Sequence, residues 1–283
     1  MSNKRKLSFL IVGTMKSGTT TLADLLNKSA NIYLPASEIH FFDNQFNKGF
    51  EWYQEKLKKD IPYNKQKNNI LIGEKTPTYS YKANCAERIF SCSKDLKLIW
   101  IFRNPVKRSF SNYLHAVKKG NEIRSFKYCI DNEERRIKKD IFKGYLERSI
   151  YIKQVKRFLK FFDISQMHFI LFEELLINPE IVFSKLMDFL ECENDIKDFE
   201  LPYSNKTFLP RFPIVRYGTK KLLNENSIIT KSINKINLNI NKLIPNKKYQ
   251  LNKELENYLN DYFLLYNKQF SQITNLDISI WKN

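Results

Sequence analysis

Four short apolar segments stand out along the chain, at residues 7–12, 70–73, 96–102 and 167–172. Segments of this length, bounded by glycine or polar residues, are typical of strands buried on both faces of a parallel sheet. Between them, apolar residues recur at helical spacing in residues 21–26, 105–117, 151–162 and 179–190. The alternation predicts an α/β fold with an open, mainly parallel sheet and helices on both of its faces.

The pattern loosens in the C-terminal part of the chain. Residues 202–248 are rich in proline, lysine and asparagine, and a helical pattern returns at residues 253–266. Composition leaves three interpretations of the stretch 231–248 open, namely a linker, a mobile cover over a site, or plain surface. We predict a single domain over residues 1–283, with a core at 1–200 and a C-terminal region at 201–283.

Composition places the chain among globular proteins and gives it a strong positive charge. Its 283 residues are 42% hydrophobic, which excludes a disordered chain, and 48 basic residues against 30 acidic ones give a formal charge of +18. The charge fits attraction of phosphate, sulfate or a polyanion, and it fits equally well a set of solvated lysines. Because the sequence has no zinc-finger spacing, no RNP-like aromatic motif and no basic-region heptads, we predict no nucleic-acid partner.

The cysteines and the apolar runs bear on location. The four cysteines form no C-x2-C pair, so neither a disulfide framework nor a zinc site is predicted, and a reduced, intracellular setting is the simplest interpretation. The N-terminal apolar run is too short for a signal-peptide core, and no stretch approaches the roughly 20 apolar residues that span a bilayer. We therefore expect a cytoplasmic protein without a transmembrane segment. The sequence does not indicate its oligomeric state.

The first predicted strand runs into a loop, Gly13 to Thr20, that leads into a helix. Such a turn presents backbone N–H groups and the positive helix end to an anion. Its spacing is close to the nucleotide-triphosphate motif G-x-x-x-x-G-K-[ST], which makes the predicted fold P-loop-like. However, the position that holds lysine in that motif is Thr19, and the lysine stands three places earlier, at Lys16.

A second departure from the triphosphate motif lies at the end of the strongest predicted strand. ATPases carry an aspartate there to hold magnesium, whereas this chain has Arg103. An arginine in this place is suited to a second phosphate, which its guanidinium binds with two parallel hydrogen bonds. The two departures predict an anionic nucleotide that is held without a metal ion.

Four sequence blocks carry a resemblance to a known family: Lys16–Thr20, Glu38–Phe42, Glu74–Pro77, and Ile101–Pro105 with Ser111–Tyr113. In this order they resemble the sulfotransferases that use 3′-phosphoadenosine 5′-phosphosulfate (PAPS). The second and third blocks resemble the heparan-sulfate and bacterial carbohydrate branch. The resemblance covers about residues 7–190. It implies a sulfotransferase domain whose core at 1–200 binds the nucleotide and carries the catalytic residues, and whose C-terminal region at 201–283 covers the active site. It implies in-line transfer of a sulfuryl group from PAPS to a hydroxyl or amine of a carbohydrate acceptor, with 3′,5′-adenosine bisphosphate (PAP) as product and no metal.

The resemblance also implies roles for the residues that hold the donor. Lys16 contacts the donor and helps the leaving phosphate to depart. Arg103 and Ser111 bind the 3′-phosphate, and Tyr151 lies near the nucleotide. Backbone and hydroxyl donors to the phosphosulfate come from Ser17, Gly18, Thr19 and Thr20.

For the acceptor side, the resemblance implies that Glu38 is the general base for the acceptor hydroxyl. His40 is the alternative base, since a histidine serves in other branches. Lys75 assists at the transferred group or binds the acceptor. The identity of the acceptor and the position that is sulfated are not indicated.

A late basic loop of the family closes over the adenosine end of the donor. Arg211 is the best counterpart here, with Lys220 and Lys221 as substitutes. The heparan-type enzymes have a disulfide-bonded loop in this place, but this chain has no cysteine after Cys192.

Two other classes of protein stay open at this point. A P-loop kinase for a nucleoside or small metabolite is disfavoured by the position of Lys16 and by the missing strand-end aspartate. A non-catalytic protein that binds a polyanion is supported only by the charge of +18.

Overall fold

The computed structural model describes residues 7–65, 70–201, 209, 212–222, 227–243 and 250–282. Arg211, the predicted late contact to the donor, lies outside the described residues. The chain divides into two compact units, which are described separately below. The first contains residues 1–104, 151–204 and 266–283, and the second contains residues 105–150 and 205–265.

The first unit is built on a sheet of five parallel strands in the order β2-β3-β1-β4-β5. The strands are β1 (Leu7–Gly13), β2 (Ile32–Tyr33), β3 (Leu71–Lys75), β4 (Lys97–Phe102) and β5 (Met167–Leu171). β1 lies at the centre, with Ile11 opposite Lys75 on one side and opposite Ile99 on the other. Because all strands are parallel, their carboxyl ends share one edge of the sheet, where open α/β sheets bind ligands.

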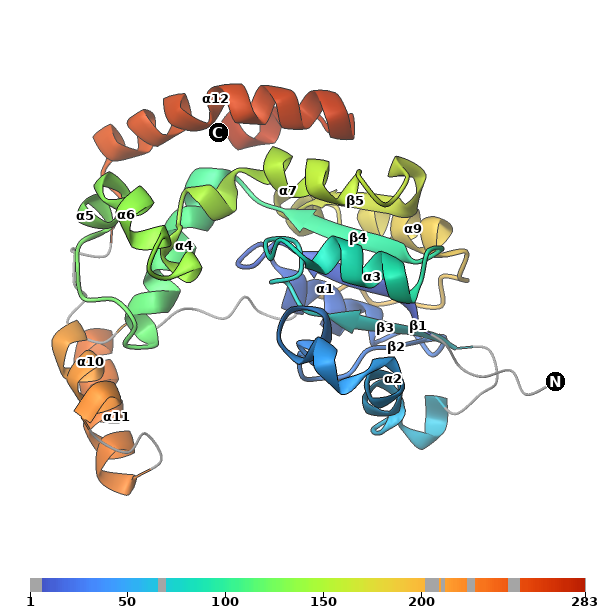
Figure 1. Ribbon diagram of the computed structural model, residues 1–283, viewed down its shortest axis with the longest axis horizontal. Helices are drawn as coiled ribbons and strands as arrows, with labels where there is room; N and C mark the ends of the chain where they lie inside the picture. Colours follow the sequence, from blue (N-terminus) through green and yellow to red (C-terminus); the bar gives the residue numbers. More distant parts are fainter. Residues whose placement is uncertain are drawn as a thin grey trace. The chain divides into compact units, whose positions relative to one another are not determined.

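Helices cover both faces of this sheet (Figure 1). The helices of the first unit are α1 (Thr19–Leu26), α2 (Phe50–Lys58), α3 (Cys85–Cys92), α7 (Tyr151–Phe158), α8 (Phe172–Ile177) and α9 (Pro179–Leu190). On one face, Phe9 and Ile11 of β1 form a buried cluster with Leu25 of α1 and Phe183 of α9.

The opposite face is aromatic. Side chains alternate between the two faces of a strand, so Trp100 and Phe102 of β4 point away from the cluster around Ile11. The Trp100 ring packs edge-on against Phe158 of α7, with ring centroids 4.8 Å apart, and Phe102 packs at 4.7 Å against Phe270. Phe270 belongs to α12 (Lys253–Thr274), whose last residues return to the first unit. Because helices cover both faces of the sheet, side chains on both sides of each central strand are buried, which explains the continuous apolar runs in the sequence.

The second unit is helical. Its helices are α4 (Pro105–Lys118), α5 (Phe126–Asp131), α6 (Glu133–Ile137), α10 (Pro213–Leu222) and α11 (Ile228–Leu243). Two of its buried charged side chains, Arg108 and Glu133, are hydrogen-bonded within the unit. The Arg108 side chain donates to Ser149 Oγ and to the Tyr145 carbonyl, both at 2.7 Å, and Glu133 accepts from backbone N–H groups at residues 145–147. These contacts fix the chain that follows α6, up to residue 149.

The structure confirms the predicted α/β class and adds elements that the pattern did not show. β2 is only two residues long, too short for a recognisable period. α10 and α11 lie in the stretch whose pattern loosens. The buried side of α11 is polar, with Thr230, Asn234 and Asn237 at most 7% exposed. Isoleucines at positions 229, 233, 236 and 240 do recur at helical spacing in α11, but the prediction for this stretch followed its lysine and asparagine content instead. The predicted boundary at residue 200 stays a prediction.

Gly18 tests how tightly the loop after β1 is packed. Its φ of +94° is in the left-handed region, and a Cβ atom there would overlap the ring of Phe172. We expect Gly18→Ala to lower the free energy of unfolding by about 2–4 kcal/mol, since both the backbone strain and the overlap act. Gly218→Ala is the control, because Gly218 is helical with open space around it, and it should stabilise by about 0.5–1 kcal/mol. Denaturant unfolding measures both; equal stability of the two variants would contradict the packing described.

Candidate active site

The loop after β1 is fastened to the neighbouring strand from inside. The Thr14 N–H donates to the Ile101 carbonyl at 2.8 Å, and the hydroxyls of Thr14 and Ser17 are hydrogen-bonded at 2.7 Å. Both side chains are buried, so Ser17 lies on the inner side of the loop and shapes it. Lys16, half-buried, has a φ of +73°. A non-glycine residue in this region carries strain, which is characteristic of functional loops.

Helix α1 begins directly behind this loop. Gly18 is its N-cap residue and offers no side-chain cap. The first N–H groups of a helix have no partner within the helix, and they form its positive end. Thr19 is buried and Thr20 is exposed at this end. A lysine, an exposed hydroxyl and the N–H groups of a helix start are the donors that an anionic phosphate or sulfate group needs, so the loop is chemically suited to such a group.

Arg103 follows β4 at the same edge of the sheet. Its guanidinium lies 5.3 Å from the centroid of the Phe172 ring and donates to the Lys16 carbonyl at 3.5 Å. Burial lowers its pKa, partly offset by the charge of Glu173. Tyr151 is buried and its hydroxyl donates to the Arg103 carbonyl at 2.7 Å. Tyr151 thus fixes the backbone that carries Arg103.

Ser111 lies half-buried on α4, in the second unit, whereas Arg103 belongs to the first. Their joint binding of a 3′-phosphate stays a prediction. Lys220 and Lys221 lie exposed near the end of α10, and the Lys220 ammonium donates to the Asn121 side chain at 2.7 Å.

Lys75 connects two of the predicted parts of the site. It is the last residue of β3 and its side chain is only 9% exposed. Its ammonium lies 3.3 Å from Glu38 Oε1 and 3.4 Å from Thr20 Oγ1. Residues from three segments therefore meet at the edge of the sheet: the start of α1, the segment after β2 and the end of β3.

His40 lies between two carboxylates. Its Nε2 is 3.3 Å from Glu38 Oε2, and its Nδ1 is 3.0 Å from Asp43 Oδ2. Asp43 is 1% exposed and also accepts from the Thr78 hydroxyl at 2.6 Å. The backbone permits this because His40 has a φ of +56° and caps a short π-helix, Phe41–Gln45, that contains Asp43. Asp43 was not predicted from the sequence. The observation that could have indicated it is an acidic residue three positions after His40.

These contacts separate the protonation states of the two candidate bases. The hydrogen bond that His40 donates to Asp43, and after it the one that it donates to Glu38, raise the pKa of His40 to about 10. Burial alone would raise the pKa of Glu38, but the hydrogen bond from His40 and the charge of Lys75 outweigh burial and lower it. At neutral pH both ring nitrogens of His40 are therefore protonated, so His40 cannot take up another proton. Glu38 is then an ionised carboxylate and can take up a proton. The geometry favours Glu38 as the base.

The imidazole of His40 should titrate far from its ordinary range. We expect histidine NMR signals to show His40 protonated past pH 8, while burial holds the pKa of His168 to about 4. The folded pKa of His40 is raised, so its stabilising effect is complete below about pH 6.5 and is lost as the pH rises through about 10. Asp43→Asn should lower the pKa of His40, whereas Asp131→Asn, an exposed control on α5, should not. A wild-type His40 that titrates near pH 6.5 would contradict this arrangement.

Below these residues, Glu74 positions the segment that carries Glu38. It is fully buried and accepts from the Tyr53 hydroxyl at 3.2 Å, from the Ile39 N–H at 3.3 Å and from the Thr76 hydroxyl. Burial raises its pKa to about 7. Because the Ile39 N–H is next to Glu38 in the chain, this buried carboxyl holds Glu38 against β3. Sequence reasoning did not assign this role to Glu74.

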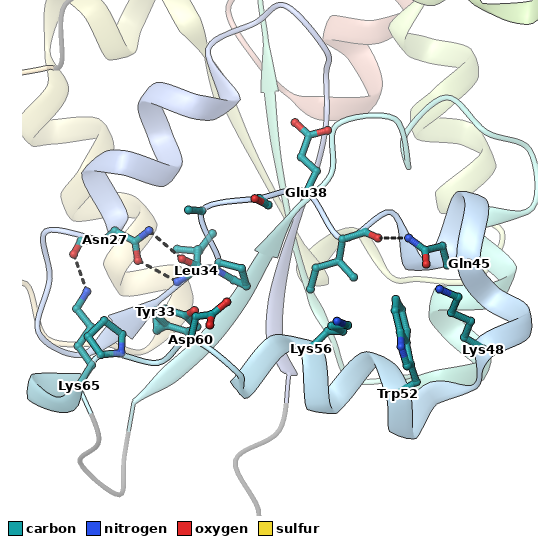
Figure 2. A pocket seen from close by; sticks show the side chains of 15 residues that line it. Asn27, Tyr33, Leu34, Glu38, Gln45, Lys48, Trp52, Lys56, Asp60 and Lys65 are labelled. Atoms are coloured by element: carbon teal, nitrogen blue, oxygen red, sulfur yellow. Dashed lines mark hydrogen bonds between the residues drawn. The ribbon is translucent and has the colours of Figure 1, made fainter. Parts of the chain in front are cut away.

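A cavity of about 890 Å³ opens beside Glu38 (Figure 2). Its walls come from the end of α1, the segment after β2 and helix α2, all in the first unit. Glu38, Ile39, Lys48, Trp52, Lys56 and Lys65 are among the residues that line it. Its volume lies within the range of about 300–1,000 Å³ that is usual for small-molecule sites.

The fold and this site define an α/β protein in which a loop with cationic and N–H donors lies at the carboxyl edge of a parallel sheet, with an ionised glutamate beside it. The chain belongs to the sulfotransferase domain family, whose sequence profile matches residues 7–230. The predicted family is thereby confirmed.

Two relatives and one solved structure give the extent of the similarity. Heparan sulfate glucosamine 3-O-sulfotransferase 3B1 of Homo sapiens is 30% identical over 70% of this chain and 49% of its own length. Heparan sulfate glucosamine 3-O-sulfotransferase 5 of Mus musculus is 32% identical over 73% of this chain and 60% of its own length. The chain thus spans less than two thirds of these relatives.

The crystal structure of a sulfotransferase from Alicyclobacillus acidocaldarius matches with a TM-score of 0.71 at 23% identity, covering 98% of this chain and 99% of that one. At this identity the match shows a shared fold. Among the helices in the described ranges, each falls short of the length and apolar character that a membrane crossing requires.

Proposed function

We propose that the protein transfers a sulfuryl group from PAPS to a hydroxyl or amine of a carbohydrate. The observation that carries the proposal is the contact of Lys75 with both Glu38 and Thr20, at 3.3 and 3.4 Å. It brings a base for the acceptor next to the loop suited to the donor. Family membership and the names of the heparan sulfate glucosamine 3-O-sulfotransferases support the reaction and the acceptor class.

PAPS supplies a sulfuryl group on a phosphate that leaves readily. In the proposed reaction, the carboxylate of Glu38 takes the proton of the acceptor hydroxyl as the acceptor oxygen bonds to sulfur. The bond between sulfur and the bridging oxygen breaks, and its electron pair stays on the 5′-phosphate of PAP. Lys16 and the N–H groups at the start of α1 stabilise that negative charge, and Lys75 stabilises the transferred group.

The remaining residues position the reacting groups. Thr14 and Ser17 hold the loop, Tyr151 holds the backbone of Arg103, and Asp43 keeps His40 protonated against Glu38. Charge stabilisation by fixed lysines and N–H groups needs no divalent ion in this scheme. A cytoplasmic location remains a prediction from the sequence.

Transfer of radiolabelled sulfate from PAPS to pools of glycans tests the proposal, with Glu38→Gln as the inactive control. Calorimetry should show tight binding of PAP without magnesium, and weaker binding of ATP with magnesium. Preference for ATP with magnesium would instead indicate a kinase. Binding without nucleotide selectivity and with steep salt dependence would indicate a polyanion-binding protein.

A further inference from the structure

The cavity beside Glu38 has a wall on which two lysines converge on one indole. The Lys48 ammonium lies 4.5 Å from the centroid of the Trp52 ring, and the Lys56 ammonium lies 5.7 Å from it. All three residues line the cavity, as Glu38 does. Figure 2 shows Lys48, Trp52 and Lys56 next to one another at this wall.

Local structure explains why these side chains face the cavity. Helix α2 buries Tyr53 and Leu57 against the first unit, so Trp52 and Lys56, one helical turn apart, lie together on another side of the helix. Gly49 precedes the helix with a φ of +84°. This turn, which favours glycine, brings Lys48 back over the Trp52 ring.

The charges around the cavity leave these two lysines available to a ligand. Neither has an ion pair with another described residue. A third lysine, Lys65, instead donates to the carbonyls of Asn27 and Ile32 at 2.6 and 2.7 Å. Of the two acids that line the cavity, Glu38 is paired with Lys75 and His40, and Asp60 is exposed beside Tyr33.

We propose that Lys48, Trp52 and Lys56 form a subsite for an anionic group of the acceptor, a carboxylate or sulfate on a sugar next to the one that is sulfated. The inference rests on the proposed function, and it narrows the acceptor from a carbohydrate to an anionic oligosaccharide. Contact with the indole restricts both ammonium groups in advance, which lowers the entropy lost on binding. Pro35 and Ile39, half-buried in the same cavity, offer apolar contact to the sugar ring.

Calorimetry on the full chain tests the subsite with two probes, a heparin-derived sulfated tetrasaccharide and neutral chitotetraose, each added to protein saturated with PAP. We expect the wild type to bind the sulfated probe more tightly, and less so as salt rises. The double variant K48Q/K56Q should lose about tenfold or more of that affinity, with chitotetraose binding unchanged. Trp52→Phe should weaken binding of the sulfated probe less than Trp52→Ala does, because phenylalanine keeps an aromatic ring beside the lysines and alanine does not.

Lys59→Gln is the matched control, since Lys59 is exposed at the end of the same helix and does not line the cavity. It should bind the sulfated probe within twofold of the wild type. Thermal unfolding establishes that the variants are folded. The subsite would be overturned if K48Q/K56Q and K59Q lost the same affinity for the sulfated probe, or if the wild type did not prefer that probe. In either case, binding of PAP by the wild type would leave the proposed function standing. Failure of the wild type to bind PAP would overturn the proposed function and the inference with it.

Discussion

Glu38→Gln should reduce kcat by about 10²- to 10⁴-fold, the usual contribution of a general base. Glutamine keeps the size of the side chain and its contact with Lys75, but it does not take a proton from the acceptor. The carboxylate is prepared for this step because His40 and Lys75 lower its pKa, outweighing the partial desolvation of its side chain. Wild-type activity should therefore persist to acid pH and fall only below the ordinary titration range of a glutamate. Steady-state sulfate transfer across pH measures both effects.

Two controls separate the loss of the base from other consequences of this substitution. Glu55→Gln changes an exposed glutamate of α2 in the same way and should leave kcat within twofold. PAP affinity of Glu38→Gln should stay near the wild-type value, since Glu38 faces the acceptor in the proposed reaction. A variant that keeps its kcat within threefold would show that Glu38 is not the base.

Lys16→Ala should lower kcat by about 10²- to 10³-fold, because one cation that meets the charge on the leaving phosphate is removed. The protein should remain folded. Lys16 is half-buried in a loop whose shape comes from Thr14 and Ser17, and its φ of +73° already carries strain. Activity and thermal unfolding, measured on the same preparation, test this separation of function from stability.

Lys16→Gly makes the separation sharper. Glycine adopts a positive φ without penalty. The free energy of unfolding of this variant should therefore equal that of the wild type or exceed it by up to about 1 kcal/mol. Its kcat should fall as much as that of Lys16→Ala. The matched control is Lys59→Ala, which removes a lysine from the exposed end of α2. Unchanged transfer in Lys16→Ala would remove Lys16 from the mechanism.

Much of the fold follows from local sequence. The runs that became β1, β3, β4 and β5 are apolar because the sheet is covered on both faces, and that burial is visible in the residues themselves. β2 was not predicted, because a strand of two residues, Ile32 and Tyr33, is too short to show an alternating pattern. Helix α11 was not predicted, although isoleucines at positions 229, 233, 236 and 240 recur at helical spacing. The structure places Ile229 and Ile236 on the exposed side and buries Thr230, Asn234 and Asn237, an orientation that the apolar pattern does not indicate.

The sequence by itself determined the class of this protein and the residues of its loop. Lys16, Lys75 and Arg103 stand in short patterns directly after predicted strands, and parallel strands bring such positions to one edge; Glu38 was recognisable only from the family pattern around it. Only the tertiary structure decided which groups share protons there. The contact of Glu38 with Lys75 joins residues 37 apart in the chain. The place of Glu74 beneath Ile39 likewise joins residues 35 apart, and contacts between distant segments are not encoded in a local pattern. Asp43 beside His40, and Lys48 and Lys56 beside Trp52, are three or four residues apart in the chain. Their meaning became clear only when the structure placed the π-helix after His40 and the cavity beside α2.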